Sequence, residues 1–423
     1  MRISLQGRAR KALLLGAAAL FVVVYAGFAL TEFLAAHFSE VATLPSLRRA
    51  VRLQPRNAEY QYRLGRYLSV VEPEPEEAAH AFRAAVALDS RQARYWFALA
   101  GAYQLLGNTA GQRDALEHAV AAEPTTPEVA WEAANFYLTQ DDVDTALKHL
   151  RTVLTYDPYL PQSALPLCWR IRPDIDYLLR EVVPPNASVD STFLEFLLSK
   201  NETSAAGAVW AALVRLNQPL DRRYVFEYVR YLVANQQPDQ ARVVWEQAAN
   251  LSNLSPYQPS AENLVVNGDF SLEILNGGFD WMYRESPDVS LALDPTQFHS
   301  GHDSLHLSFD SRGLEDAGIR QLVSVRPNTS YTVSSYYRAE DLQGAGGLRL
   351  VVQDLYTGKI CFASEDLANS DFWKQVGGSF TANPETRLVV LRIQRQPAGS
   401  PIKGRLWIDN VRLAPVRGQG GSN

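Results

Sequence analysis

The apolar residues of this chain follow two different spacings, and the change falls near residue 253. Up to about residue 252 they recur with the period of amphipathic helices. From residue 264 to residue 415 apolar and polar residues alternate, as around Leu305, Leu307 and Phe309, which indicates half-buried strands. One hydrophobic core rarely organises 423 residues. The pattern therefore predicts a multidomain chain, with an all-α part followed by an all-β part.

The helical part repeats at a fixed period. A motif of the form A-V-x-L-x-P, or a near variant of it, closes at Pro55, Ser90, Pro124 and Pro158, in steps of 35, 34 and 34 residues. Proline at the end of a unit stops one helix before the next begins. We therefore expect stacked pairs of helices over residues 39–160.

This region resembles the tetratricopeptide repeat, a 34-residue unit of two helices. Small and aromatic residues stand where that family packs its helices together, including Gly65, Trp96, Tyr103, Ala78 with Phe82, and Ala146 with Leu150. The resemblance implies a solenoid that binds a protein partner in its groove. The candidate groove residues are Tyr60, Arg63, Arg66 and Tyr67, although a solvated helix face explains them equally well.

The period is interrupted and then returns in a weaker form. Prolines break it over 161–185, and the pairs Ala206 with Trp210 and Ala241 with Trp245 resume it 35 residues apart. We expect divergent helical repeats over 161–252. A segment rich in Ser, Asn and Pro then predicts a linker at 253–263, and residues 416–423 are expected to form a flexible tail.

Short strands separated by Gly, Pro and Asn predict a two-sheet sandwich over 264–415. The opening segment Asn263–Phe270 and the closing segment Leu406–Val411 resemble the two ends of jelly-roll carbohydrate-binding modules, which have a galactose-binding-like fold. The resemblance implies that fold, with a polysaccharide as the expected ligand. A purely structural sandwich is the alternative, because the same fold serves both roles.

A sugar site needs an aromatic face and a few polar groups for hydroxyls. The candidates are Trp281, Tyr283, Tyr337 and Gln353, with packing inside a loop as the alternative for Trp281. Trp373 and Trp407 occupy positions that the family uses for its core, so they are interpreted as packing residues. Such modules often carry a structural calcium, and the candidate oxygen ligands here are Asp269, Glu273 and Asp409.

The N-terminal region contains an uncharged apolar run over residues 12–30, long enough as a helix to cross a bilayer. Arg2, Arg8, Arg10 and Lys11 precede it, so the positive-inside rule predicts a cytoplasmic segment at 1–11 and a single membrane anchor at 12–38. The rest of the chain is then periplasmic, in a bacterial inner-membrane protein. A cleaved signal peptide is the alternative, but its apolar stretch would be shorter.

Composition and motifs narrow the function classes. The net charge is −6 and no basic stripe follows the N-terminus, which argues against nucleic-acid binding. Two cysteines are too few for a disulfide scaffold, and no H-E-x-x-H, G-x-S-x-G or phosphate-loop motif occurs. We expect a non-enzymatic scaffold that joins a protein partner to an envelope polysaccharide. The alternatives are a protein-only assembly factor and an unrecognised glycoside hydrolase.

Overall fold

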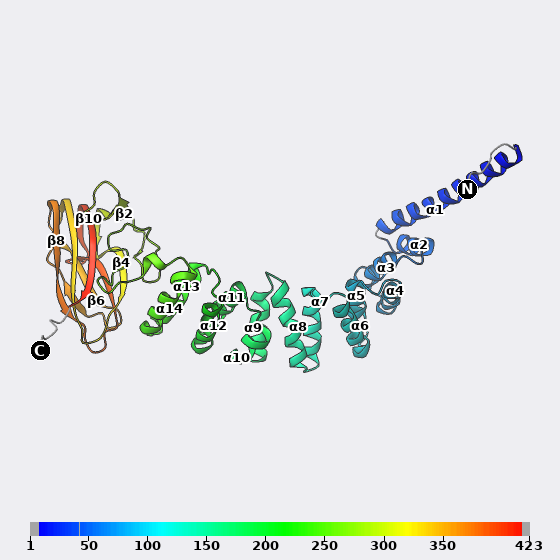
Figure 1. Ribbon diagram of the computed structural model, residues 1–423, viewed down its shortest axis with the longest axis horizontal. Coiled ribbons are helices and arrows are strands. Elements are labelled where there is room, and N and C mark those ends of the chain that lie inside the picture. Colours follow the sequence, from blue (N-terminus) through cyan, green and yellow to red (C-terminus); the bar gives the residue numbers. More distant parts are fainter. Residues whose placement is uncertain (1–7, 42, 417–423) are drawn as a thin grey trace. The chain divides into compact units, whose positions relative to one another are not determined.

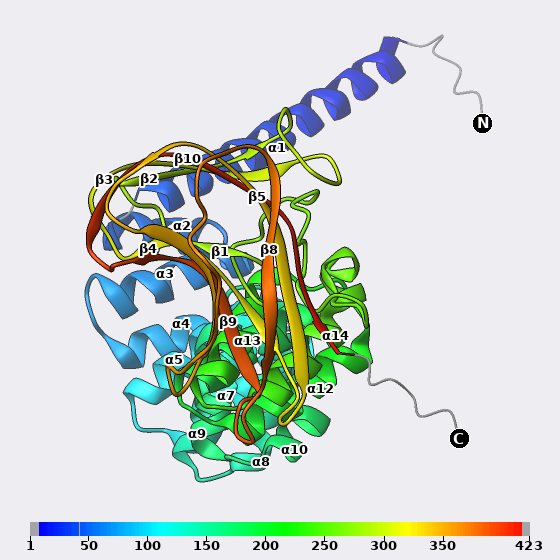
Figure 2. The same ribbon diagram turned by 90° about the vertical axis from the view of Figure 1, so that its left-hand side faces the viewer.

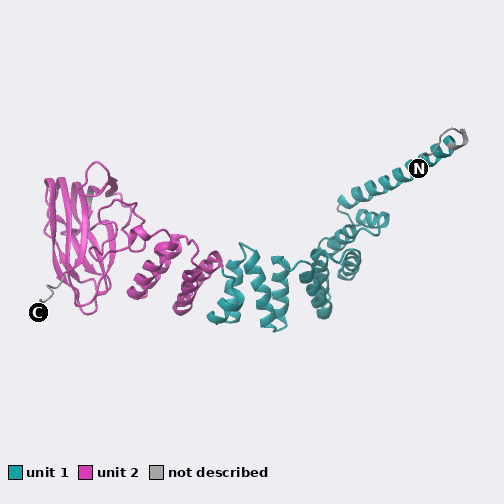
Figure 3. Ribbon diagram, in the orientation of Figure 1, with its two compact units in different colours: residues 1–185 teal, residues 186–423 magenta. Residues whose placement is uncertain are grey.

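The computed structural model describes residues 8–41 and 43–416, and it divides into two compact units, residues 1–185 and 186–423 (Figure 3). The expected fold class is confirmed: paired helices fill the first unit and the start of the second, and an antiparallel sandwich follows (Figure 1). Most of the expected N-terminal segment 1–11 and of the expected tail 416–423 lies outside the described residues.

The first unit begins with a long helix, α1 (Arg8–Glu40), which is exposed along most of its length. Only its last turns are packed, since Ala35 is 0% exposed and the Arg49 guanidinium of α2 lies 5.6 Å from the centre of the Phe38 ring. The helices that follow are α2 (Leu44–Leu53), α3 (Ala58–Val70), α4 (Pro75–Leu88), α5 (Ala93–Leu105), α6 (Thr109–Ala122), α7 (Pro127–Thr139), α8 (Val143–Tyr156), α9 (Pro161–Ile171), α10 (Ile175–Tyr177) and the π-helical turn η1 (Leu178–Val182).

The repeat spacing is set by helix ends and by small residues inside each pair. Helices α3, α5 and α7 begin 35 and 34 residues apart, as the motif predicts. A Cβ atom at Gly65 of α3 would lie 2.6 Å from the Phe82 ring of α4, so glycine is needed for the two helices to approach this closely. Ala78, Phe82, Ala146 and Leu150 are all buried, as expected.

The second unit opens with two helical pairs, α11 (Ala187–Ser199) with α12 (Thr203–Leu216) and α13 (Arg222–Ala234) with α14 (Pro238–Leu251). The segment expected to be a linker, residues 253–263, joins α14 to the sandwich. It contains the short helix η2 (Ser255–Tyr257), in which Tyr257 is 8% exposed and donates its hydroxyl hydrogen to the Glu273 carbonyl. Its polar composition gave no sign that the side chains of Leu254 and Tyr257 are buried.

Within the described residues, ten strands form the sandwich, in two five-stranded sheets. One sheet has the order β1 (Met282–Tyr283), β4 (Asp316–Ser324), β9 (Leu388–Gln396), β6 (Gly347–Asp354) and β7 (Ile360–Ala363). The other has the order β2 (Val289–Asp294), β3 (Ser304–Leu314), β10 (Ser400–Pro415), β5 (Ser330–Gln343) and β8 (Ser370–Thr381). Every strand pair is antiparallel, and β10 lies between β3 and β5 (Figure 2).

The core of the sandwich lies between the inner faces of the two sheets. Leu305, Leu307, Val333, Leu391 and Leu406 are each 0–1% exposed within it. The two chain segments that open and close the domain are joined directly, because the Asn263 side chain donates to the Val411 carbonyl and the Val411 N–H donates to the Gly268 carbonyl. These contacts give the motif at the two ends a structural role.

Candidate functional site

The two outer faces of the sandwich have different surroundings. The outer face of the sheet β1-β4-β9-β6-β7 contacts the helices, since the Tyr356 hydroxyl donates to the Val233 carbonyl of α13 and Leu322 shares a hollow with Phe226. In Figure 1, β8 and β10 lie on the side of the sandwich away from α13. We call the outer face of the sheet β2-β3-β10-β5-β8 the distal face, and it carries the candidate site.

Three aromatic rings gather on the distal face, one from a loop and two from strands. His299 stacks on Tyr336 with 3.6 Å between ring centres, and it meets the Trp373 ring edge to face with 6.0 Å between ring centres. Strand alternation explains the direction of Tyr336. Tyr331, Val333 and Tyr337 of β5 point into the core, so Tyr336 points outward. Tyr336 and Trp373 are half-buried and His299 is exposed, so part of this cluster is open to solvent.

A network of charged and polar groups lies beside these rings. Arg338 donates to Gln297 at 2.6 Å and to Glu340 at 2.7 Å, and Arg405 completes the network with an ion pair to Glu340 at 2.8 Å. These groups are partly exposed, and each is held in place by its neighbours. They supply donors and acceptors next to an aromatic surface.

Trp407 lies beneath this polar layer, outside the hydrophobic core. Its ring is 4% exposed, stacks on His306 at 4.7 Å and donates its indole hydrogen to Asp294 at 2.8 Å. Burial opposes ionisation of Asp294, but hydrogen bonds from Thr296 and Trp407 outweigh it and hold the pKa of Asp294 at about 2. Burial lowers the pKa of His306. Trp407 is therefore a buried support for the distal face.

The distal face has the chemistry that a carbohydrate requires. Half-exposed rings can cover the apolar C–H side of a sugar, and the neighbouring guanidinium, amide and carboxylate groups can hydrogen-bond its hydroxyls. His299 and His306 belong to two different ring stacks. Within the described residues, no three His, Cys, Asp or Glu side chains form a group that could hold a metal ion.

The sugar-binding residues chosen from the sequence are not brought together. Trp281 is 2% exposed, stacks on Phe270 and donates to the Asn267 carbonyl, and Tyr337 is buried in the sandwich core. Both expectations are corrected, because a ring enclosed by the core offers no face to a ligand. Tyr283 is half-buried and packs against the core. Gln353 lies on the other sheet, where it binds Arg392 and the Gly358 carbonyl.

Sequence reasoning missed Tyr336 and Trp373, although a signal for Tyr336 was present. Side chains alternate between the two faces of β5. Because Tyr331 and Val333 point inward, Tyr337 also points inward and Tyr336 points outward. Trp373 is expected in the core, but it lies against His299 on the distal face. His299 is positioned by tertiary contacts of a loop, which periodicity does not show.

The carboxylates proposed for calcium do not form a metal site. Asp409 is 0% exposed and accepts the backbone N–H groups of His299 and Ser300, each at 2.7 Å. Burial raises its pKa, against the opposing effect of these hydrogen bonds. Asp269 instead accepts the Ser271 N–H, and Glu273 is exposed. The three residues do not fit calcium, and Asp409 serves to fix the loop that carries His299.

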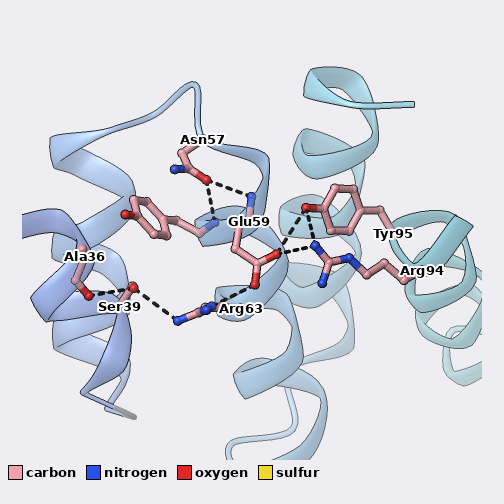
Figure 4. Close-up of polar contacts among 8 residues, drawn as sticks. Ala36, Ser39, Asn57, Glu59, Arg63, Arg94 and Tyr95 are labelled. Atoms are coloured by element: carbon pink, nitrogen blue, oxygen red, sulfur yellow. Dashed lines mark hydrogen bonds and ion pairs between the residues drawn. The ribbon is translucent and has the colours of Figure 1, made fainter. Parts of the chain in front are cut away.

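The candidate groove residues of the repeat region lie on α3, where Arg63, Arg66 and Tyr67 line a hollow of about 500 Å³. Tyr60 is not part of its lining. Glu59 organises the hollow, since it accepts from Arg63 at 2.9 Å, Arg94 at 2.9 Å and the Tyr95 hydroxyl at 3.2 Å (Figure 4). Three arginines and one glutamate are among the lining residues, and Glu59 pairs with Arg63 and Arg94.

Comparisons with known proteins agree with this division of the chain. Residues 262–400 match the family described as carbohydrate binding domain. No curated protein matches the chain.

Among solved structures, MamA is 15% identical over 40% of this chain and 94% of its own, with a TM-score of 0.32. PilF of Pseudomonas aeruginosa is 16% identical over 52% of this chain and 93% of its own, with a TM-score of 0.27. The xylan-binding domain CBM22-1 of Paenibacillus barcinonensis Xyn10C is 16% identical over 38% of this chain and 98% of its own, also with a TM-score of 0.27. Similarities at this level do not bear on function.

Proposed function

We propose that the chain is a membrane-anchored, extracytoplasmic scaffold that holds a glycan on the distal face and a protein partner on the repeat region. The observation that carries this proposal is the half-exposed cluster of His299, Tyr336 and Trp373 on a domain that matches the carbohydrate-binding family. Such a scaffold raises the local concentration of a polysaccharide beside envelope machinery for its synthesis, ligation or export. Its role is tethering.

The anchor in this proposal is α1. It is the one helix within the described residues that is long and apolar enough to cross a membrane, and its apolar stretch is exposed. The positive charges before it favour a cytoplasmic N-terminus. The repeats and the sandwich would then lie in the periplasm of a bacterium, attached to the inner membrane by a single pass.

The glycan site is tested by polysaccharide pull-down with the full chain in lipid nanodiscs. Trp373→Ala removes the indole ring, the largest ring of the cluster, so we expect retention on the bound polysaccharide to fall by about tenfold or more. Phe372→Ala is the matched control, because Phe372 is 66% exposed and adjacent in sequence but lies on the opposite side of β8. This control should bind like the unmodified chain.

Two other outcomes would replace the proposal. If no polysaccharide in a broad panel is retained by the folded chain, the sandwich is structural and the protein-only assembly factor is favoured. If the chain releases new reducing ends from a polysaccharide, it is a glycoside hydrolase. Equal loss of binding in Trp373→Ala and Phe372→Ala would place the ligand elsewhere on the domain.

The protein-binding groove is tested separately with Arg66, which lines the hollow and lies 6.0 Å from the Tyr62 ring. Placing a photo-reactive amino acid at Tyr67 should capture the partner in cells. Arg66→Glu should reduce this capture, because it reverses the charge offered to an acidic segment. Arg83→Glu, on the exposed side of α4, is the control. Equal capture by both variants would contradict the assignment of the groove.

A further inference from the structure

A second hollow lies within the second unit, between α13 and the sheet β1-β4-β9-β6-β7. Its volume is about 460 Å³. Its walls are held together by direct contacts, including the Tyr356–Val233 hydrogen bond of 3.0 Å and the close approach of Gly277 to the Phe226 ring. We call it the α13 pocket. The pocket lies against the sheet β1-β4-β9-β6-β7, whereas the distal face belongs to the other sheet, so the pocket is separate from the proposed glycan site.

The interior of the α13 pocket is mostly apolar, and both walls contribute to it. Phe226, Val229 and Val233 come from α13, and Leu322 and Leu355 come from the sandwich. Phe226, Val233 and Leu355 are only half-buried, so part of their apolar surface still contacts water, and covering it is favourable. The volume is within the range of small-molecule sites. An apolar body of modest size would therefore fill it favourably.

Cationic side chains border this apolar interior. Arg222, Arg230 and Arg320 line the pocket and are exposed, and none of the three forms an ion pair within the described residues. Of the acidic lining residues, Asp221 is engaged at the start of α13, where it accepts the Arg223 N–H at 2.8 Å. The formal charge of the lining is +2, from Arg222, Arg223, Arg230 and Arg320 against Asp221 and Glu227.

We propose that the α13 pocket binds a small amphipathic anion. Its apolar body would lie against Phe226, Val229 and Leu322, and its anionic group would pair with the guanidiniums of Arg230 and Arg320. A guanidinium pairs well with a carboxylate or a phosphate, and it does so more strongly beside an apolar surface than in open water. This binding activity is additional to the scaffold function and does not depend on it.

The test uses the full chain in nanodiscs, with equilibrium dialysis of radiolabelled octanoate and empty nanodiscs as the blank. We expect octanoate to bind at a single saturable site and octylammonium, of the same length and opposite charge, not to bind. Arg230→Glu and Arg320→Glu should each weaken octanoate binding by about tenfold or more, because a hydrogen-bonded charge pair is replaced by repulsion. Both residues are exposed, so the fold should be unaffected.

Arg83→Glu is the matched control, since it makes the same charge change at an exposed arginine of α4, outside the pocket. Val233→Phe, which fills the apolar wall, should also block binding. The proposal is overturned if octanoate shows no saturable binding, if octylammonium binds equally well, or if Arg83→Glu weakens octanoate as much as the pocket variants do. Polysaccharide retention by the same variants should be unchanged, which keeps this result independent of the glycan site.

Discussion

At the scale of single residues, a buried carboxyl group makes the stability of the sandwich depend on pH. Asp280 is 0% exposed, in the loop that packs against α13 and α14. Burial raises the pKa of Asp280 to about 7, although hydrogen bonds from the Leu275 and Trp281 backbone act in the opposite direction. The folded chain therefore favours the protonated carboxyl. Its stabilising contribution is complete below the ordinary pKa of an aspartate and is lost as the pH rises through about 7.

Asp280→Asn keeps the shape of the side chain and cannot ionise. We expect it to raise the Tm of the unit by more than ~3 °C at pH 8 and to leave it nearly unchanged at pH 4. Thermal unfolding followed across this pH range measures the difference between variant and parent. Asp190→Asn is a useful companion, because burial also raises the pKa of Asp190 to about 7 at a distant place in the same unit. An equal effect of Asp280→Asn at both pH values would contradict the titration.

At the scale of elements, the last helical pair packs directly against the sandwich. The Trp245 ring of α14 packs 6.0 Å from Phe226 and 6.0 Å from Phe279, and its indole donates to the Tyr257 carbonyl. The approach is possible because Gly278 has a positive φ of 63° and no side chain; a Cβ atom there would lie 2.0 Å from the Trp245 ring. This junction gives the α13 pocket two fixed walls.

Gly278→Ala should destabilise the second unit through two effects. The left-handed backbone costs an alanine ~1–2 kcal/mol, and displacement of the Trp245 ring costs ~1–3 kcal/mol more. Gly399→Ala isolates the first effect, since Gly399 has a φ of 75° but open space around it. Urea unfolding of the two variants gives the difference directly. If both lose the same free energy, Trp245 can move aside at no cost and the junction is not tightly packed.

The sequence predicted these elements better than it predicted their contacts. The 34-residue period and the strand alternation depend on local spacing, so helices and strands could be located without tertiary information. The junction could not, because Leu254 and Tyr257 stand among polar residues and acquire partners only after folding. The same limit applies to the site: the inward or outward direction of Tyr336 follows from alternation, whereas the stacking of His299 depends on a loop held by Asp409.

At the scale of the whole molecule, the feature that bears on the membrane anchor is that α1 continues into the packed part of the first unit. The helix runs unbroken from Arg8 to Glu40, and its exposed part gives way to packed residues only at Ala35 and Ser39. The Arg63 guanidinium donates to the Ser39 hydroxyl at 3.3 Å (Figure 4). A cleavage beside Ala35 would therefore cut a segment that packs against the repeat region, and the proposed scaffold requires α1 to stay attached.

We therefore expect the protein extracted from bacterial membranes to retain residues 12–40 and to resist release by alkaline carbonate. Intact-mass measurement identifies the N-terminus without ambiguity. Ala35→Glu should lower the stability of the first unit, because a charge buried without a partner is costly. Ala36→Glu changes an exposed neighbour and should leave the stability unchanged. A mature N-terminus at or after Ala35, with the chain released in soluble form, would show a cleaved signal peptide. The tether would then have to be supplied by the partner in the repeat groove.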